Sequence, residues 1–282
     1  MIDISLIVAT LGRYEEVERL LTSLAQQTID HRRLEVIIVD QNDSIDLTPI
    51  IAIFSKHLAI SHIRSTKHGV AFNRNKGLAI ARGSIVAFPD DDCTYYADTL
   101  ERVLDHYQQE PESVLLLGSV YDRNTNQPVI RRWPKHAIRA TPANVFFLYS
   151  SITIFSRLRS LLFDERLGAG APYGSYDDAD YVFRALQYGP VQYSPAVQVW
   201  HSDLNASLMP PAKIRAYGVG FGAFVAKHFT IYCIAIFIMA VGYHVGMAVK
   251  SALFFDAKNT KAHFISITSR VSGVVSFLVH ES

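Results

Sequence analysis

The sequence predicts an α/β fold with a mainly parallel sheet, followed by a helical tail, on three observations. Strand-like and helix-like segments alternate from the first residues to about residue 88. The first strand-like run, residues 4–9, is almost continuously apolar, which is typical of a strand covered on both faces. After Pro210 the chain becomes helical and apolar. Strands that alternate with helices of about ten residues form right-handed crossovers, and such crossovers make neighbouring strands parallel.

The remaining elements follow in order along the first half of the chain. The apolar side chains that recur between residues 17 and 24 predict a helix after the first strand. Further strands are expected at residues 34–39, 59–63 and 85–88, with helices at 47–54 and 70–81 between them. A helix to Gln109 and a strand at 114–117 come next. The stretch after them contains Pro128, Pro134 and Pro142, which break up any long element.

Composition limits the classes of protein to consider. The chain has 282 residues, 49% of them hydrophobic and 19% charged, so it can bury a large core. We expect one α/β domain at residues 1–210 and a helical region at 211–282. A net charge of +1 and the lack of a Lys/Arg run disfavour nucleic-acid binding. Cys93 and Cys233 are too few for a disulfide framework or a zinc site, and the first residues resemble no secretory signal.

Three consecutive carboxylates, Asp90, Asp91 and Asp92, follow the apolar run at residues 84–88. Two like charges about 4 Å apart repel by about 4 kcal/mol at a protein surface, so the cluster calls for a positive partner. Mg²⁺ and Mn²⁺ prefer oxygen ligands and are often shared with substrate phosphates. The alternative is an acidic turn, or an acidic start to the helix near Tyr95.

Polar residues follow two other strands of the expected sheet. Thr10 ends the first strand, and residues 40–43 follow the second. In parallel sheets, ligands bind at the carboxyl ends of the strands. The sequence therefore predicts that these residues and the three carboxylates gather at one edge.

The C-terminal region is apolar enough to associate with a membrane. Residues 229–249 contain no Asp, Glu, Lys or Arg, and about twenty such residues can cross a bilayer as a helix. A buried core helix and a membrane-embedded hairpin remain open alternatives. Apolar side chains between residues 264 and 278 fall on one helical face, which suits a helix lying in the interface. The charges at the two ends of the apolar stretch do not assign an orientation.

Four motifs in order resemble those of the family 2 glycosyltransferases. They are the segments at residues 6–13, 36–43, 69–77 and 88–92, and the resemblance extends from residue 1 to about 202. The family implies an inverting, nucleotide-sugar-dependent enzyme with the GT-A fold, a Rossmann-like mixed sheet flanked by helices. A hydrophobic C-terminal extension is typical of its membrane-associated members.

The resemblance implies a donor site around a D-x-D motif. Asp90 and Asp92 match that motif, so Asp92 would contact Mg²⁺ or Mn²⁺, and Asp90 would contact the ribose or the water shell of the metal. Asp91 would face the sugar or cap a turn. The resemblance places Thr10, Arg13, Asp40 and Arg74 at the nucleotide, with Asp40 accepting from a base N–H. The alternative for Asp40 and Arg74 is a structural salt bridge.

The acceptor side of the site is expected at residues 174–184. This segment resembles the Glu-Asp-x-Asp-hydrophobic-x-x-Arg motif of the family, which makes Asp178 the general base and leaves Asp177 as the other candidate. The alternative is an acidic first helical turn, with Asp180 and Arg184 as a surface pair. His201, at the end of a strand-like run, is either a third metal ligand or structural.

These features together predict an enzyme that transfers a sugar from a nucleoside-diphosphate donor to a hydroxyl of a saccharide or lipid-linked acceptor. Cell-surface polysaccharide or glycoconjugate synthesis at the cytoplasmic side of a membrane is the expected setting. A sugar nucleotidyltransferase is the nearest rival, although the short first turn at residues 9–13 argues against it. A non-catalytic membrane-bound scaffold of the same fold is the other. The oligomeric state cannot be read from the sequence.

Overall fold

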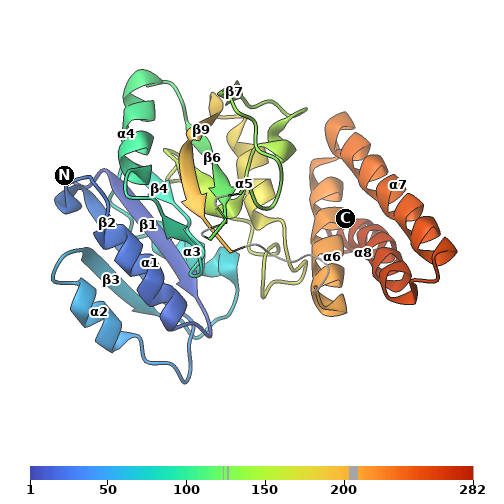
Figure 1. Cartoon of the computed structure of the whole chain (residues 1–282), viewed down its shortest axis with the longest axis horizontal. Coiled ribbons are helices and arrows are strands. Elements are labelled where there is room, and N and C mark those ends of the chain that lie inside the picture. The colour runs from blue at the N-terminus through green and yellow to red at the C-terminus, as the bar shows by residue number, and fades with distance from the viewer. Residues whose placement is uncertain (123, 126, 203–208, 282) are drawn as a thin grey trace. The chain divides into compact units, whose positions relative to one another are not determined.

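The computed structural model describes residues 1–122, 124–125, 127–202 and 209–281 (Figure 1). The chain divides into two compact units. The first comprises Met1–Phe163 and Tyr181–Leu204, and the second comprises Asp164–Asp180 and Asn205–Ser282.

The first unit is built on a mixed sheet with the strand order β3-β2-β1-β4-β8-β6-β9-β5, and β7 pairs with β9 (Figure 1). The four N-terminal strands in this order are parallel to one another, whereas β8 is antiparallel to both of its neighbours. The predicted α/β sheet is confirmed. The strands are β1 (Ile4–Thr10), β2 (Leu34–Asp40), β3 (Ala59–Arg64), β4 (Ile85–Ala87), β5 (Thr94–Tyr95), β6 (Leu115–Tyr121), β7 (Ile138–Arg139), β8 (Ile154–Ser156) and β9 (Val191–Trp200).

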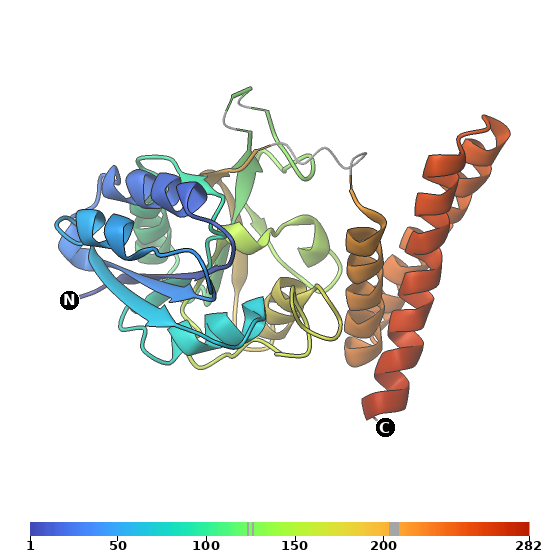
Figure 2. The same ribbon diagram turned by 90° about the horizontal axis from the view of Figure 1, so that it is seen from below.

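Helices cover both faces of this sheet. Helices α1 and α2 lie on one face, and α3 lies on the opposite face (Figure 2). This follows from right-handed crossovers, because the strand order runs outward from β1 to β3 and then returns to β4. The helices are α1 (Glu15–Ala25), α2 (Thr48–Phe54), α3 (Val70–Leu78), α4 (Thr99–Gln109) and α5 (Asp177–Ala185), with 3₁₀ turns η1 (His31–Arg33), η2 (Val145–Phe147) and η3 (Ser151–Thr153).

Helix α3 packs closely on β1 at Gly77. A Cβ atom at this position would overlap the side chain of Ile7, so only glycine permits the approach. The close packing fixes the helix that carries Arg74 against the central strand of the sheet.

The register of the parallel strands aligns their carboxyl ends. Thr10 is the partner of Asp40, and Asp40 is the partner of Arg64. We call residues 90–92, which follow β4, the acidic turn. Because β1 and β4 pair in parallel, the acidic turn lies beside the end of β1. The predicted gathering of polar strand ends at one edge is therefore observed.

Three aromatic side chains lie beneath the acidic turn. The ring centroids of Phe88 and Phe163 are 4.8 Å apart, and Tyr181 lies 4.6 Å from Phe163 and 5.4 Å from Phe88. Phe88 and Tyr181 are fully buried. Because Phe88 precedes Pro89 and Asp90, this packing fixes the backbone from which the carboxylates extend.

A buried carboxylate, Glu35, joins three segments at the other end of the sheet. It accepts hydrogen bonds from Ser5 Oγ (2.6 Å), from the Arg82 amide (2.7 Å) and from Arg82 Nε (2.8 Å). Burial by itself would raise the pKa of Glu35, but these hydrogen bonds outweigh it and the pKa is lowered. The ionised carboxylate therefore stabilises the folded state.

Replacing Glu35 with Gln is expected to destabilise the protein by about 2–3 kcal/mol at neutral pH, because hydrogen bonds to a buried charge are weakened. Since the folded pKa is lowered, the contribution of Glu35 is present above its unfolded pKa of about 4.3 and is lost as the pH falls through the folded pKa. The difference between wild type and variant in urea unfolding should shrink at acidic pH. Exposed Glu112→Gln is the control; equal stability of wild type and Glu35→Gln would contradict the account.

The second unit consists mainly of three helices, α6 (Pro211–His228), α7 (Ile231–Leu253) and α8 (Ala257–Glu281), and α8 packs against both α6 and α7 (Figure 1). Helices α6 and α8 approach closely at Gly222 and Gly273, where a Cβ atom would overlap the backbone of the other helix. Helices α7 and α8 are joined by a 2.9 Å contact between the Nδ1 atoms of His244 and His263.

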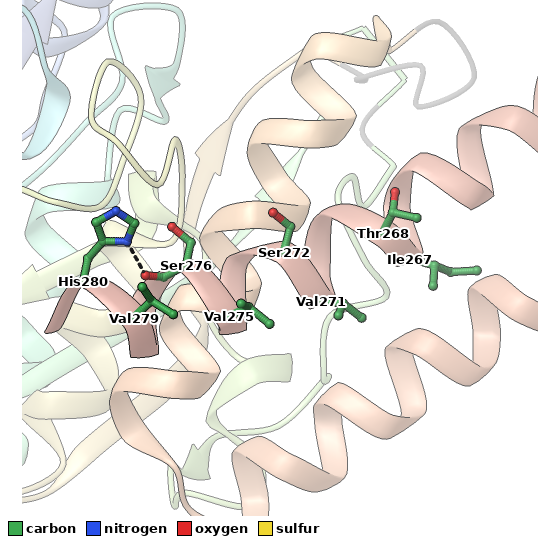
Figure 3. Close-up of a pocket in the computed structure, with 8 residues that line it drawn as sticks. All are labelled: Ile267, Thr268, Val271, Ser272, Val275, Ser276, Val279 and His280. Atoms are coloured by element: carbon green, nitrogen blue, oxygen red, sulfur yellow. Dashed lines mark hydrogen bonds between the residues drawn. The ribbon is translucent and has the colours of Figure 1, made fainter. Parts of the chain in front are cut away.

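Two segments of the second unit, 231–253 and 257–280, are long and apolar enough to cross a membrane by length and composition. One side of α8 carries two parallel rows of side chains, which line a cavity along the helix (Figure 3). Val271, Val275 and Val279 form the apolar row, and Ser272 and Ser276 belong to the polar row. The spacing of four residues places each row on one strip of the helix surface.

Asp164 and Asp180 form ion pairs with the last residues of α6. Lys227 Nζ lies 2.6 Å from both Asp164 Oδ2 and Asp180 Oδ1, and His228 Nε2 lies 2.8 Å from Asp180 Oδ1. Asp180 is fully buried. A buried carboxylate needs such partners, so Lys227 and His228 compensate the burial of Asp180.

Candidate functional site

Five side chains from three parts of the first unit converge at the acidic turn. Asp91 Oδ2 accepts a 2.7 Å hydrogen bond from Thr10 Oγ1, and Asp92 Oδ2 lies 2.8 Å from Arg13 Nη1. Arg13 Nε is 3.7 Å from Asp91, and His201 Nε2 is 3.4 Å from Asp92 Oδ1. We call Thr10, Arg13, Asp91, Asp92 and His201 the carboxylate cluster. The ends of β1, β4 and β9 bring its members together.

The two carboxylates of this cluster differ in their electrostatics. Burial raises the pKa of Asp91 to about 6, against the hydrogen bond from Thr10 and the charge of Arg13. Burial also acts on Asp92, but the hydrogen bond from His201 and the nearby positive charges outweigh it and lower its pKa. The hydrogen bond to Asp92 raises the pKa of His201. The cluster thus holds one strongly ionised carboxylate, Asp92, and an adjacent one that protonates more readily.

Asp90 belongs to a separate set of contacts. Its Oδ1 atom lies 2.8 Å from Arg74 Nη2, and its Oδ2 atom accepts a 3.2 Å hydrogen bond from Ser151 Oγ. Arg74 is 3% exposed, and its guanidinium carbon lies 5.3 Å from the centre of the Phe163 ring. The sequence analysis considered a structural salt bridge as the alternative role of Asp40 and Arg74. In the structure, Arg74 forms a salt bridge with Asp90.

Asp40 is completely buried among residues of β2 and β3. Its Oδ2 atom lies 2.7 Å from Arg64 Nη1 and 2.9 Å from His62 Nε2, and its Oδ1 atom accepts from the amide of Asn42. Burial would raise the pKa of Asp40, but these hydrogen bonds lower it. Both of its oxygens are thus engaged by the chain itself.

Sequence reasoning missed His62 and Arg64. They stand two residues apart on β3, so they point to the same face, and Arg64 is the register partner of Asp40. The signal in the sequence that could have indicated them is the presence of two polar residues, two positions apart, at the end of a predicted strand. A cavity of about 390 Å³ adjoins them, lined by Asp43, Ser44, Ile45, Asp46, Thr48, His62 and Arg64.

The residues expected on the acceptor side lie in the second unit, at the start of α5. Asp177 is 6% exposed, and Asp178 is half-buried and accepts a 2.8 Å hydrogen bond from the Ala179 amide. Asp180 is fully buried and forms ion pairs with Lys227 and His228. Of the two candidates for the base, Asp178 is the more accessible.

The donor atoms of the carboxylate cluster fit a hard divalent cation. Among the residues that the structure describes, no three His, Cys, Asp or Glu side chains form a metal-binding group. Asp92 and His201 nevertheless offer one carboxylate and one imidazole side by side, and Mg²⁺ commonly takes only one or two protein ligands, with water and phosphate completing its shell. Arg13 supplies the positive charge beside Asp92 in this structure.

Comparison with known proteins decides the family. The model of glycosyl transferase family 2 matches residues 5–165, more than half of the chain. The chain belongs to glycosyl transferase family 2. The matched residues of this family 2 chain include Thr10, Arg13, Asp40, Arg74 and the three carboxylates at 90–92. They do not include the candidates at 177, 178 and 201.

Curated relatives of this family 2 protein share its N-terminal part. A glucosyl-dolichyl phosphate glucuronosyltransferase of Haloferax volcanii is 29% identical over 128 residues, which are 42% of this chain and 38% of that protein. A PGL/p-HBAD biosynthesis glycosyltransferase of Mycobacterium tuberculosis is 34% identical over 126 residues, 43% of this chain and 48% of that protein. The chain thus matches less than half the length of these relatives.

Solved structures share the fold of the whole chain. TarS residues 1–349 from S. aureus, in complex with UDP-GlcNAc, aligns with a TM-score of 0.61 at 17% identity and covers 99% of this chain and 92% of that one. The mannosyltransferase PcManGT from Pyrobaculum calidifontis, in complex with GDP-Man and Mn²⁺, aligns with a TM-score of 0.64 at 15% identity, over 99% and 88% of the two chains. The predicted GT-A fold is confirmed.

Proposed function

We propose that this family 2 protein is an inverting glycosyltransferase. It transfers a sugar from a nucleoside-diphosphate donor to a hydroxyl of a saccharide or lipid-linked acceptor, and it acts at a membrane. Residues 1–210 form the catalytic part in this proposal, and residues 211–282 form the membrane-associating part.

The convergence of Asp91 and Asp92 with Thr10, Arg13 and His201 is the observation that carries the proposal. Such a cluster at the carboxyl ends of parallel strands suits a ligand with a diphosphate and several hydroxyl groups. Arg13 can donate forked hydrogen bonds to a phosphate, and Asp91 can accept from a sugar hydroxyl. The donor would therefore lie at this edge of the sheet.

In this proposal Asp92 and His201 hold Mg²⁺ or Mn²⁺, and Asp90 orients the ribose or a water of the metal. The bound cation would supply Lewis-acid stabilisation of the departing diphosphate. Arg74 keeps the Asp90 carboxylate in place through its buried guanidinium. The PcManGT structure, which contains Mn²⁺, supports a metal-assisted reaction in this fold.

The nucleotide base would occupy the cavity at the ends of β2 and β3. Asp40 is fully engaged there, so its part is to orient His62 and Arg64, which then donate to the base. Thr10, at the end of the neighbouring strand, is the register partner of Asp40 and also donates to Asp91, so it connects the proposed base site with the rest of the carboxylate cluster.

The general base in this proposal is Asp178, because it is the more accessible of the two adjacent carboxylates. It would remove the proton of the acceptor hydroxyl during the attack on the anomeric carbon. A positioned base of this kind contributes about 10² to 10⁴ to the rate.

Membrane association rests on the helices of the second unit. Helix α7 exposes large apolar side chains, among them Ile238, which is 64% exposed, and Met239, which is 56% exposed. A run of such side chains on a helix as long as α7 suits contact with lipid. The relative named as a glucosyl-dolichyl phosphate glucuronosyltransferase supports an acceptor that is linked to a lipid.

A screen of nucleotide sugars with Mn²⁺ tests the proposed activity. One donor should raise the thermal midpoint through its binding free energy, and it should release a nucleoside diphosphate when an acceptor is added. A nucleotidyltransferase would instead form pyrophosphate from a nucleoside triphosphate and a sugar phosphate. If donors bind but no nucleoside diphosphate is released, the protein would be a non-catalytic scaffold. Pyrophosphate formation or donor binding without turnover would overturn the proposal.

Introducing a charge at Ile238 tests the membrane part. Ile238→Asp should move most of the protein from the membrane fraction to the soluble fraction, because an Asp in the middle of a membrane helix costs about 2.5–3.5 kcal/mol. Ile53, which is 55% exposed on α2, provides the matched control Ile53→Asp. If both variants fractionate like the wild type, α7 does not contact lipid.

A further inference from the structure

The segment between Asp122 and Asp164 has a strongly one-sided charge. It contains seven Lys or Arg residues and no Asp or Glu, although the chain as a whole has a net charge of only +1. Four of the seven, Arg131, Arg132, Lys135 and Arg139, fall within nine residues. We call residues 129–139 the basic segment. Carboxylates are thus absent from this part of the sequence, and an anion from outside the chain would meet positive charge there.

The basic segment is fixed to the sheet of the first unit. Trp133 is buried, stacks on Tyr193 with ring centroids 6.3 Å apart, and donates a 3.0 Å hydrogen bond to the Val129 carbonyl. The hydroxyl of Tyr193 donates to the Pro134 carbonyl at 2.9 Å. Strand β7 then pairs with β9 at the end of the segment. The cations are therefore presented on a rigid support, which lowers the entropy lost when a ligand binds.

The cations themselves point to an anionic ligand. Arg132, Lys135 and Arg139 are exposed, and within the described part of the chain none of them forms an ion pair. The guanidinium carbon of Arg131 lies 5.3 Å from the ring centre of Trp133 and 5.7 Å from that of Tyr149, and Arg131 Nη1 donates to the Phe146 carbonyl. Its Nε atom is buried and has no hydrogen-bond partner among the described residues. A buried N–H without an acceptor is costly, so this site has an unmet need for one.

Both ends of the stretch that carries the basic segment touch the candidate donor site. At its start, the Tyr121 carbonyl accepts a 2.9 Å hydrogen bond from the His201 amide. Towards its end, Ser151 Oγ donates to Asp90. The stretch therefore begins beside His201 of the carboxylate cluster, and its last part lies beside Asp90 of the D-x-D motif. Apolar side chains accompany the cations, since Ile130 and Phe147 are 49% and 55% exposed.

We propose that the basic segment binds the phosphate group of a lipid-linked acceptor. Arg guanidinium groups bind phosphate through forked hydrogen bonds, and exposed apolar side chains beside them suit the hydrocarbon that carries the phosphate. The two ends of the stretch contact the donor site, whereas β7 pairs with the first residues of β9, at the other end of that strand from His201. The phosphate would therefore be held apart from the diphosphate of the donor, which is assigned to the carboxylate cluster. This inference rests on the proposed function and specifies the chemical class of its acceptor.

Vesicle binding by the full-length protein tests the inference. Three vesicle compositions are compared: phosphatidylcholine alone, phosphatidylcholine with undecaprenyl phosphate, and phosphatidylcholine with phosphatidylglycerol at equal charge. The variant is the triple substitution R132Q/K135Q/R139Q. The matched control is R32Q/K56Q/R102Q, which removes three exposed cations elsewhere in the first unit. Stabilisation by a nucleoside-diphosphate sugar is measured for every protein in parallel.

We expect the wild type and the control to bind undecaprenyl phosphate vesicles about tenfold more tightly than the phosphatidylglycerol vesicles. The triple variant should lose this preference, because it lacks the three exposed cations that are proposed to contact the phosphate, yet it should still be stabilised by the donor. Equal binding to both anionic vesicles, or an unchanged preference in the triple variant, would overturn the inference. Failure of the wild type to be stabilised by any donor would count against the proposed function instead.

Discussion

Replacing Asp92 with Asn should lower kcat by about 10²- to 10³-fold, the largest effect expected of any single change at the donor site. The loss follows from the proposed role of Asp92, because an interaction that stabilises the charge developing on a leaving group acts in the transition state. Asn keeps the size of the side chain but removes the charge that now pairs with Arg13 and His201. Steady-state kinetics with the donor found in the nucleotide-sugar screen provides the measurement.

Asp105→Asn is the matched control for this substitution. Asp105 is exposed on α4, and removing its charge should leave kcat unchanged. The thermal midpoint of both variants should stay near that of the wild type, which separates a catalytic defect from unfolding. If Asp92→Asn retained full activity and normal metal dependence, Asp92 would not act on the diphosphate.

Replacing Asp178 with Asn should reduce kcat by about 10²- to 10⁴-fold while leaving donor binding intact. The expected loss is that of a general base, which acts on the acceptor hydroxyl and not on the nucleotide. Stabilisation by the donor with Mn²⁺ is therefore the readout that distinguishes this variant from Asp92→Asn. A variant that lost donor binding together with activity would contradict the role given to Asp178.

Asp177→Asn is the comparison that separates the two adjacent carboxylates. Asp177 is 6% exposed, so it is less able to meet an acceptor than the half-buried Asp178. Its replacement should lower stability more than it lowers kcat in the folded protein. The reverse order of effects on kcat would assign the base to Asp177.

The sequence predicted the parallel strands β1 to β4 well because buried parallel strands leave a clear signal, whereas the short strands β5, β7 and β8 were not predicted. All seven residues of β2 are buried, so the strand appears as an apolar run that ends at Asp40. The carboxylates after β4 were visible for the same reason, since three charges end an apolar run. That Thr10 and the acidic turn meet follows from topology, because parallel strands bring their carboxyl ends together.

The choice of partners within the site was harder to predict. Arg74 was placed near Asp40 by the resemblance, but it pairs with Asp90, while Asp40 pairs with His62 and Arg64. Pairing among several carboxylates and cations depends on side-chain directions that periodicity does not determine. His62 and Arg64 illustrate this, because polar residues in a half-exposed edge strand resemble ordinary surface residues.

The partners of Asp180, in the first turns of α5, could not be predicted from the sequence either. The surface pair of Asp180 and Arg184 was the alternative to an acceptor-site motif, but Asp180 is fully buried and held by Lys227 and His228. These partners follow it by more than forty residues, and nothing in the local pattern connects them. Burial of a carboxylate depends on the tertiary contacts that neutralise it, so the helical spacing alone suggested an exposed pair.

Binding of Mn²⁺ in the presence of a nucleoside diphosphate tests the central claim most directly. Titration of the wild type, Asp92→Asn and Asp105→Asn by calorimetry, with the nucleoside diphosphate of the preferred donor, provides the measurement. We expect Mn²⁺ and the nucleotide to strengthen each other's binding in the wild type and in Asp105→Asn, and Asp92→Asn to weaken Mn²⁺ binding at least tenfold. Equal Mn²⁺ affinity in all three proteins would contradict the account.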